Sequence, residues 1–179
     1  MRKVLFILGQ LTDQDVEWLA AHGTRSDIAA GTALITQGTP VADLFIVLDG
    51  SLSISVAGVG EITHIGSGEI VGEMSFIDKR PPSASVIALS PCRVLRLPRA
   101  AVEARIAADP AFGMRFFKAI ATFLSDRLRG TVSRLGFGAD GHLDAEEMEG
   151  ELDLEVLEKV HLAGARFDRM LKRLNGMEV

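Results

Sequence analysis

The sequence predicts a mainly β fold with helices: an antiparallel jelly-roll barrel flanked by an N-terminal helix and long C-terminal helices. Three observations support this fold class. Short apolar runs alternate with glycine-containing turns from Arg25 to Pro98, and many short strands at such spacing are typical of a jelly roll. A short helical pattern precedes this region, and long stretches of helical periodicity follow it.

The strand region divides into six predicted strands. Asp49-Gly50 is predicted to form a tight hairpin turn between two of them. The alternation that follows this turn places Leu52, Ile54 and Val56 on the inward face. The predicted strands are Leu34 to Gly38, Leu44 to Asp49, Ser51 to Val56, Glu61 to Ile65, Ser83 to Leu89 and Cys92 to Leu97.

The first helix is predicted to begin at Thr12, which has the side chain of an N-cap residue. Asp13 and Asp15 follow in the first turn, where carboxylates favour the positive end of the helix. The apolar face of this helix consists of Val16, Leu19 and Ala20. Trp18 is expected to seal the helix against its neighbour.

Two helices are predicted directly after the strands, at Arg99 to Ala108 and from Ala111 to about Leu135, with Pro110 near the start of the second. The second carries a broad apolar stripe, which indicates either packing on its own barrel or a dimer interface. We expect a homodimer through Phe117, Leu124 and Leu128. The full stripe is Phe112, Phe116, Phe117, Ile120, Phe123, Leu124 and Leu128.

A last amphipathic helix is predicted at Leu154 to Leu174. Gly164 occupies its one missing apolar position, which either weakens the helix or marks a close helix–helix approach. Basic residues near the C-terminal end complement the helix dipole and are expected to be a solvated face. These residues are Arg166, Arg169, Lys172 and Arg173.

These patterns divide the chain into an N-terminal arm at 1–10, a ligand-binding domain at 11–135, and an acidic linker with an amphipathic helix at 136–179. The arm is too short to span a membrane and is predicted to be a strand or a packing segment. The net charge of -5 argues against broad binding of nucleic acid. The single cysteine, Cys92, excludes an internal disulfide and suits the cytoplasm, where we place the protein.

The most informative segment extends from Gly66 to Val86. It has closely spaced glycines, then Gly72-Glu73, a short helical turn at Met74 to Ile77, and Pro81-Pro82-Ser83-Ala84. Glycine allows a close approach of the backbone to a ligand, and consecutive free amides form a nest for an anion. The carboxylate of Glu73 beside such a nest would repel a phosphate but could accept a hydrogen bond from a hydroxyl. This layout therefore predicts a sugar phosphate as ligand.

This segment resembles the phosphate-binding cassette of cyclic nucleotide-binding domains, the sensors of catabolite activator proteins, cyclic-nucleotide-dependent kinases and gated channels. The resemblance extends over roughly Leu11 to Gly130, with turn glycines at Gly31, Gly38, Gly50 and Gly68. It implies that Glu73 accepts a hydrogen bond from the ribose 2′-hydroxyl, and that the amides of Ser83 and Ala84 donate hydrogen bonds to the cyclic phosphate. It also implies an apolar wall of Ile54, Ile62 and Met74.

Pro82 departs from the pattern of the family's cyclic-AMP binders, which usually carry an arginine at this place. Proline offers neither a cation nor a backbone donor, whereas an arginine makes a strong charge-assisted pair with phosphate. Arg80 lies two residues away and could supply the missing charge. The resemblance further implies that the long helix covers the ligand, and Thr122, Ser125 and Thr131 are candidates to meet its base.

The sequence thus predicts a regulatory protein that binds a cyclic nucleotide resembling cyclic AMP and signals through its C-terminal helices to a protein partner. A ligand-free protein scaffold of the same fold is an alternative, favoured by Pro82. A DNA-binding transcription regulator is a second alternative, disfavoured because Asp140 to Glu158 holds nine acidic residues and no Lys or Arg.

No catalytic group, metal or cofactor is expected. The four histidines are scattered, and no Ser-His-Asp or Cys-His arrangement is evident. The run from Asp140 to Glu147 resembles half of a calcium-binding loop, but the first and third ligand positions fall on Gly136 and Gly138. An acidic helix start capped by Asp144 explains this run better than a calcium site.

Overall fold

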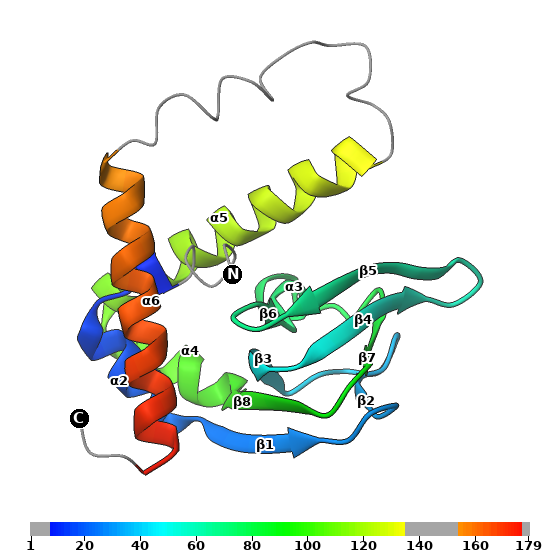
Figure 1. The fold of residues 1–179 in the computed structure, drawn as a ribbon, viewed down its shortest axis with the longest axis horizontal. Helices are drawn as coiled ribbons and strands as arrows, with labels where there is room; N and C mark the ends of the chain where they lie inside the picture. The colour runs from blue at the N-terminus through cyan, green and yellow to red at the C-terminus, as the bar shows by residue number, and fades with distance from the viewer. Residues whose placement is uncertain (1–7, 135–153, 177–179) are drawn as a thin grey trace.

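The computed structural model describes residues 8–134 and 154–176. Eight strands form a two-sheet sandwich, and most of the helices gather at one end of it (Figure 1). The strands are β1 (Thr24–Ile28), β2 (Ala33–Ile35), β3 (Asp43–Asp49), β4 (Ser51–Val56), β5 (Gly60–Gly66), β6 (Ile70–Val71), β7 (Ser85–Ala88) and β8 (Cys92–Pro98).

The strands pair in the orders β1-β8-β3-β6 and β2-β7-β4-β5, and the pairings are antiparallel. The antiparallel jelly-roll architecture is therefore confirmed, but the described strands form two four-stranded sheets rather than a closed barrel. Buried side chains of both sheets meet between them, among them Val47, Leu52, Val86 and Val94. Cys92 is buried here too, and its thiol donates to the carbonyls of Ser51 and Ser90.

The described helices are α2 (Asp13–His22), α3 (Glu73–Asp78), α4 (Arg99–Ala108), α5 (Pro110–Arg134) and α6 (Leu154–Leu174). Thr12 caps α2 as predicted, because its hydroxyl accepts from the amide of Asp15 while Asp15 accepts from the amide of Thr12. Trp18 stacks on His22 and packs against Phe112 of α5. The predicted sealing role of Trp18 agrees with these contacts.

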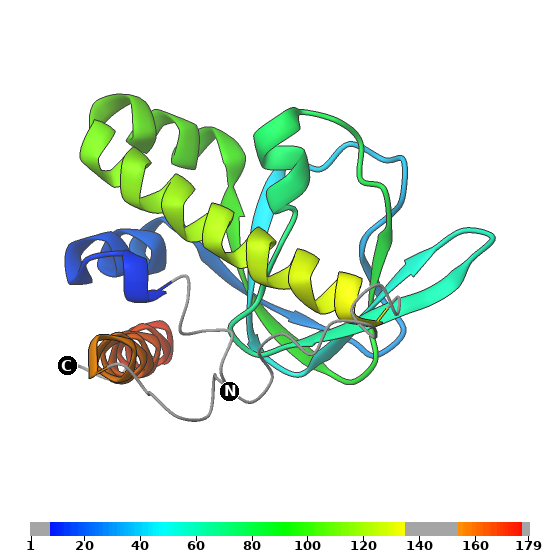
Figure 2. The same cartoon turned by 90° about the horizontal axis from the view of Figure 1, so that it is seen from above.

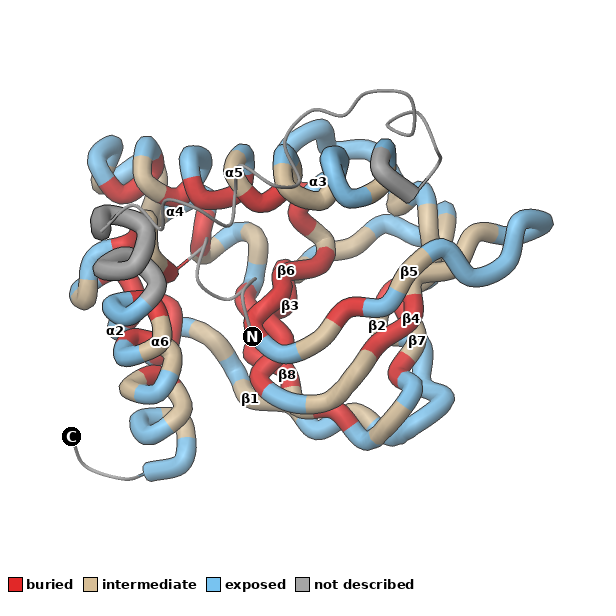
Figure 3. The backbone as a smooth tube through the Cα atoms, turned by 45° about the horizontal axis from the view of Figure 1, so that its top comes forward, coloured by how far each residue is buried: buried red, intermediate tan, exposed pale blue. Residues whose placement is uncertain are grey.

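A second core lies where the helices meet the outer face of the β1-β8-β3-β6 sheet. Figure 3 shows the buried faces of α2 and α5 turned toward this core. Its fully buried members include Leu19, Leu44, Leu95, Phe112, Phe116 and Phe123. Seen from above, α5 runs from the helical end across the sandwich and past α3 (Figure 2). The core thus fixes α5 between the helical end and the loops of the sandwich.

Helix α6 lies alongside α2 (Figure 1). Ala163 and Met170 of α6 are fully buried in the helical core. For α6, one of the two alternatives for Gly164 is excluded, and the expected exposure of Arg166 is wrong. A Cβ at Gly164 would meet nothing within 4 Å, so this glycine marks no close helix approach. Arg166 is only 9% exposed rather than solvated, because the acidic first turn of α2 faces it.

The predicted element bounds agree with the structure to within a few residues, with two differences. Leu8 to Gln10 is helical rather than extended, and Leu8 packs in the core. The short strands β1 and β6 were not delimited from the sequence. The segment at 140–147, which resembles half of a calcium-binding loop but was expected to be an acidic helix start, lies outside the described residues. Among the described helices, none has the length and apolar character that crossing a membrane requires.

Candidate ligand-binding site

A cavity of about 270 Å³ lies where α3 and the loop before β7 meet the edges of both sheets and the distal part of α5. Most of the residues predicted to bind ligand line it, although they come from distant parts of the sequence. The lining consists of Ile35, Ile54, Val71, Gly72, Glu73, Met74, Ser75, Asp78, Arg80, Pro81, Pro82, Ser83, Ala84, Val86 and Arg127.

Gly72 sets the start of α3 beside this cavity. Its φ of 89° lies in the left-handed region, and a Cβ there would approach the carbonyl oxygen of Asp43 to 2.9 Å. Only glycine adopts this conformation without strain. The carbonyl of Gly72 accepts from the amide of Phe76 at 3.0 Å and so begins the helix. Glycine here places the first residue of α3, Glu73, at the wall of the cavity.

Glu73 is 2% exposed and pairs with an arginine of α5. Nη1 of Arg127 lies 2.7 Å from Oε1 of Glu73, and Nη2 donates to the carbonyl of Ile70 at 3.2 Å. The guanidinium also lies 4.3 Å from the ring centroid of Phe123. Burial raises the pKa of Glu73, and the positive charge of Arg127 offsets part of that effect. The pair joins the cassette helix to the long helix.

The backbone amides of Ser83 and Ala84 have no acceptor within the part of the chain that the structure describes. The loop around them is held by other bonds: the amide of Gly38 donates to the carbonyl of Pro82 at 2.9 Å, and the amide of Gln37 donates to Oγ of Ser85 at 3.0 Å. Two adjacent amides without acceptors, on a loop fixed by its neighbours, can bind an anion without rearrangement.

Arg80 is exposed at the rim of the same cavity. Its amide donates to Oδ1 of Asp78 at 2.9 Å, which fixes the backbone of the loop. Within the described residues its guanidinium makes no ion pair. Arg80 therefore presents a cation at the rim of the cavity, and its contact with a bound anion stays a prediction.

The predicted apolar wall is only partly right. Ile54 and Met74 line the cavity, but Ile62 does not and is 44% exposed. Ile54 pairs with Thr63 and Ser55 pairs with Glu61, so Ile62 is the extra residue of a β-bulge. Its side chain is exposed, so the wall residue that the family resemblance implied at this position is not found in the cavity.

Arg127 is the residue of this cavity that the sequence analysis missed. The polar positions considered on this helix were Thr122, Ser125 and Thr131, and none of them lines the cavity. The hydroxyls of Thr122 and Thr131 donate instead to carbonyls of their own helix. A possible signal was the position of Arg127 one turn after the buried Phe123, which places it at the border of the apolar stripe.

The apolar stripe of α5 divides between the core and the surface. Phe112, Phe116, Ile120 and Phe123 are buried, whereas Phe117 is 44% and Leu128 64% exposed. Leu124 is partly buried against the helical core. Of the predicted dimer residues, Phe117 and Leu128 therefore have exposed apolar surface.

Comparisons with known proteins agree with this geometry. Residues 25–109 match the family model of the cyclic nucleotide-binding domain. A cyclic nucleotide-binding domain from Methylobacillus flagellatus is 26% identical, with a TM-score of 0.68 over 79% of this chain and 85% of that one. Residues 25–109 thus match this family in sequence, and the fold is that of a cyclic nucleotide-binding domain.

Other similar proteins are larger or more distant. The catabolite activator protein of Thermus thermophilus shares the fold at 23% identity and a TM-score of 0.59, over 93% of this chain and 84% of that one. Glutaminase 2 of Bradyrhizobium diazoefficiens is 25% identical over 68% of this chain, and the Pycsar effector protein XpPycTIR of Xanthomonas perforans 29% identical over 62%. The matches span 19% and 37% of those two proteins.

Proposed function

We propose that the chain is a regulatory sensor that binds a cyclic nucleotide of the cyclic-AMP type in this cavity. The observation that carries the proposal is the pair of amides without acceptors at Ser83 and Ala84, in one cavity with the carboxylate of Glu73. The amides hold the cyclic phosphate, Glu73 accepts the ribose 2′-hydroxyl, and Ile54 and Met74 contact the sugar and base. Arg80 adds positive charge at the phosphate.

The family supports ligand sensing by this fold, and one solved relative supports the ligand class. The regulatory domain of protein kinase A from Toxoplasma gondii, solved with cyclic AMP, is 27% identical, with a TM-score of 0.52 over 57% of this chain and 42% of that one. That relative is a regulatory domain, and we propose a regulatory role here too, with no catalysis by this chain. The signal passes through α5 and α6 to a protein partner.

Calorimetry with cyclic AMP, cyclic GMP and cyclic dinucleotides tests the proposal. We expect saturable binding of a cyclic mononucleotide, which Ala84→Pro abolishes because proline lacks the amide donor. Glu73→Gln should weaken binding about tenfold, since a hydrogen bond to a charged acceptor contributes roughly 1.5–3 kcal/mol. Asp49→Asn changes an exposed carboxylate outside the cavity and serves as the matched control.

A ligand-free scaffold is the second candidate. Pro82 and the Arg127–Glu73 pair favour it, because the cavity lacks one cation and its carboxylate already has a partner. Flat calorimetric traces with every nucleotide at high concentration would favour the scaffold and refute the sensor.

We further propose a homodimer through the exposed side of α5. Met114, Phe117, Leu124 and Leu128 lie three, seven and four residues apart, as in the seam of a helix pair. Met114, Phe117 and Leu128 contribute most because they have the more exposed surface, while Leu124 packs partly in its own core. Leu128→Glu should convert a dimer to a monomer in sedimentation equilibrium, and Arg129→Glu on the neighbouring exposed position should not.

A further inference from the structure

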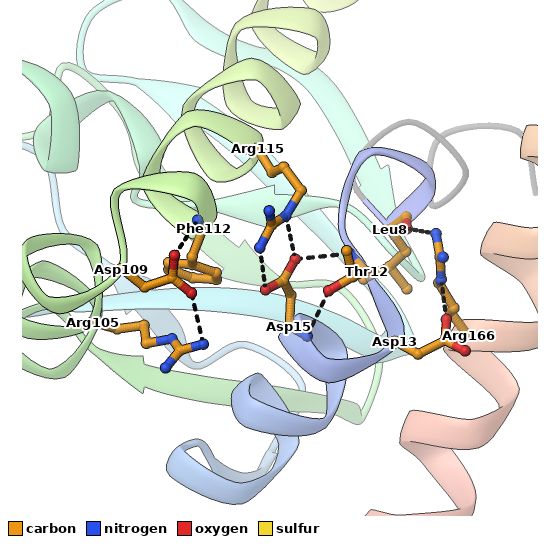
Figure 4. Close-up of polar contacts among 9 residues, drawn as sticks. All are labelled: Leu8, Thr12, Asp13, Asp15, Arg105, Asp109, Phe112, Arg115 and Arg166. Carbon is orange, nitrogen blue, oxygen red and sulfur yellow. Dashed lines mark hydrogen bonds and ion pairs between the residues drawn. The ribbon is translucent and has the colours of Figure 1, made fainter.

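The first turn of α2 is held from two sides by two different helices. Oδ1 and Oδ2 of Asp15 accept from Arg115 of α5 at 2.9 and 2.7 Å. Two residues earlier, Oδ1 of Asp13 accepts from Arg166 of α6 at 2.6 Å, and Oδ2 accepts from Arg169 at 2.9 Å. Figure 4 shows Arg115 and Arg166 on opposite sides of this turn. We call residues 12–15 the α2 bracket.

The α5 side of the bracket is rigid. Asp15 is 1% exposed, and the capping contacts with Thr12 fix its side chain and the helix start together. A buried carboxylate that loses its arginine is left uncompensated, which is strongly unfavourable. Any displacement of Arg115 must therefore either take the α2 bracket with it or leave Asp15 without its partner.

The α6 side of the bracket is the main polar attachment of that helix. Besides Asp13, the guanidinium of Arg166 donates to the carbonyl of Leu8 at 3.0 Å. Around this contact Met170 and Ala163 of α6 are buried, while Phe167 and Leu171 are partly buried against the core. Detaching α6 would expose a surface that is both basic and apolar.

The bracket is connected to the ligand cavity by α5 itself. Arg115 and Arg127 lie on one uninterrupted helix, twelve residues apart, which corresponds to about 18 Å along its axis. Arg127 holds Glu73 at the cavity. A ligand hydroxyl that competes for Glu73 changes the position preferred by α5 at this end, and a stiff helix transmits the change to Arg115.

We propose that α6 is a clasp whose docking on the α2 bracket is weakened when the cavity is occupied, so that the ligand exposes the basic and apolar face of α6. This proposal rests on the proposed function for its ligand, but the coupling between α5 and α6 exists without ligand. Coupling between two sites is reciprocal, so loosening α6 should also raise the affinity for ligand.

Hydrogen exchange of the full-length chain tests the clasp, with α6 amides compared with those of the core strands β3 and β8. Without ligand, Arg115→Gln should accelerate exchange in α6 about fivefold or more relative to the core strands. Arg129→Gln, an exposed arginine of the same helix, is the matched control and should change nothing. If Arg115→Gln leaves α6 exchange unchanged, the α2 bracket does not couple the helices and the proposal fails.

The ligand arm uses cyclic AMP at a concentration where calorimetry shows saturation. Exchange in α6 should rise about five- to 150-fold in the unmodified chain and much less in Arg115→Gln. Unchanged α6 exchange in a saturated chain would overturn the clasp. If calorimetry finds no binding, the sensor function fails, and the ligand-free arm still decides whether α5 and α6 are coupled.

Discussion

Nη1 of Arg127 lies 2.7 Å from Oε1 of Glu73, and this contact joins the distal part of α5 to Glu73, the first residue of α3. The carboxylate that should bind a sugar hydroxyl thus also anchors the long helix. Ligand binding and the position of α5 cannot be independent if they use the same carboxylate.

Arg127→Met should destabilise the fold by about 3 kcal/mol, because it leaves Glu73 buried without its partner. In the double variant Arg127→Met with Glu73→Gln, the uncompensated charge is gone, so most of the loss should be recovered. Urea unfolding followed by circular dichroism measures both. Arg129→Met is the control, and its unfolding midpoint should stay within error. Equal losses in the single and double variants would show that the ion pair is not the cause.

The α2 bracket predicts a dependence of stability on acid. Burial would raise the pKa of Asp15, but the hydrogen bonds from Arg115 and Thr12 outweigh it and hold that pKa below its ordinary value. The hydrogen bonds from Arg166 and Arg169 lower the pKa of Asp13. A carboxylate with a lowered folded pKa stabilises the fold above its unfolded pKa of about 4, and that contribution is lost as pH falls through the folded value.

Urea unfolding between about pH 5 and pH 2 should therefore show a steep loss of unfolding free energy. In Asp15→Asn the loss should be shallower, because the titrating group is gone, and the variant should be less stable at neutral pH. A variant whose stability falls with acid as steeply as the unmodified chain would exclude Asp15 as a contributor.

Glu73 should act in the opposite sense, because burial raises its pKa. A carboxyl with a raised folded pKa favours the folded state when protonated, so its contribution decreases as pH rises from about 4.3 through the folded value. Comparing Glu73→Gln with the unmodified chain over this range isolates the effect. The stability difference should shift in favour of Glu73→Gln as pH rises; no shift, or one of reversed sign, would contradict the assignment.

Gly72 and Gly164 should respond in opposite ways to substitution by alanine. Gly72→Ala should destabilise the fold by about 1–3 kcal/mol, since φ is 89° and a Cβ would lie 2.9 Å from the carbonyl oxygen of Asp43. Gly164→Ala should stabilise it by up to about 1 kcal/mol, because α6 is helical there and the Cβ position is open. Thermal unfolding should shift the two midpoints in opposite directions; shifts of the same sign would contradict the assignment.

The sequence predicted those features of the structure that depend on a few adjacent residues. The N-cap at Thr12, the hairpin turn at Gly50 and the cassette loop at Gly72 to Ala84 all involve backbone preferences of a few adjacent residues. The helical periodicity likewise predicted α6 with the observed bounds. The cassette residues could be assigned to one site because the resemblance covers the whole loop.

Contacts between distant segments could not be predicted in this way. Glu73 with Arg127, and Asp13 with Arg166, are pairs separated by 54 and 153 residues. Which face of α5 or α6 meets which turn depends on how the helices pack. Each of these helices carries several arginines, and the sequence alone does not say which of them meets a carboxylate. Ile62 was included because the family resemblance implied it, and the resemblance does not specify the bulge of this hairpin, where Ile62 is the extra residue.

Restoring a cation at position 82 tests how the cavity holds phosphate. Pro82→Arg places a guanidinium directly beside the free amides of Ser83 and Ala84, and the carbonyl of residue 82 can still accept from Gly38. A charge-assisted contact of roughly 1.5–3 kcal/mol should raise the affinity for cyclic AMP about ten- to a hundredfold.

The complementary change is Arg80→Gln, which should weaken binding in the unmodified chain but much less in Pro82→Arg, where the new guanidinium replaces its charge. Calorimetry on the four combinations gives the coupling between the two positions. Additive effects would mean that the two cations act independently and that the new guanidinium does not replace the charge of Arg80. A Pro82→Arg variant that folds, by circular dichroism, but binds cyclic AMP no better would mean that the phosphate does not lie at the amides of Ser83 and Ala84.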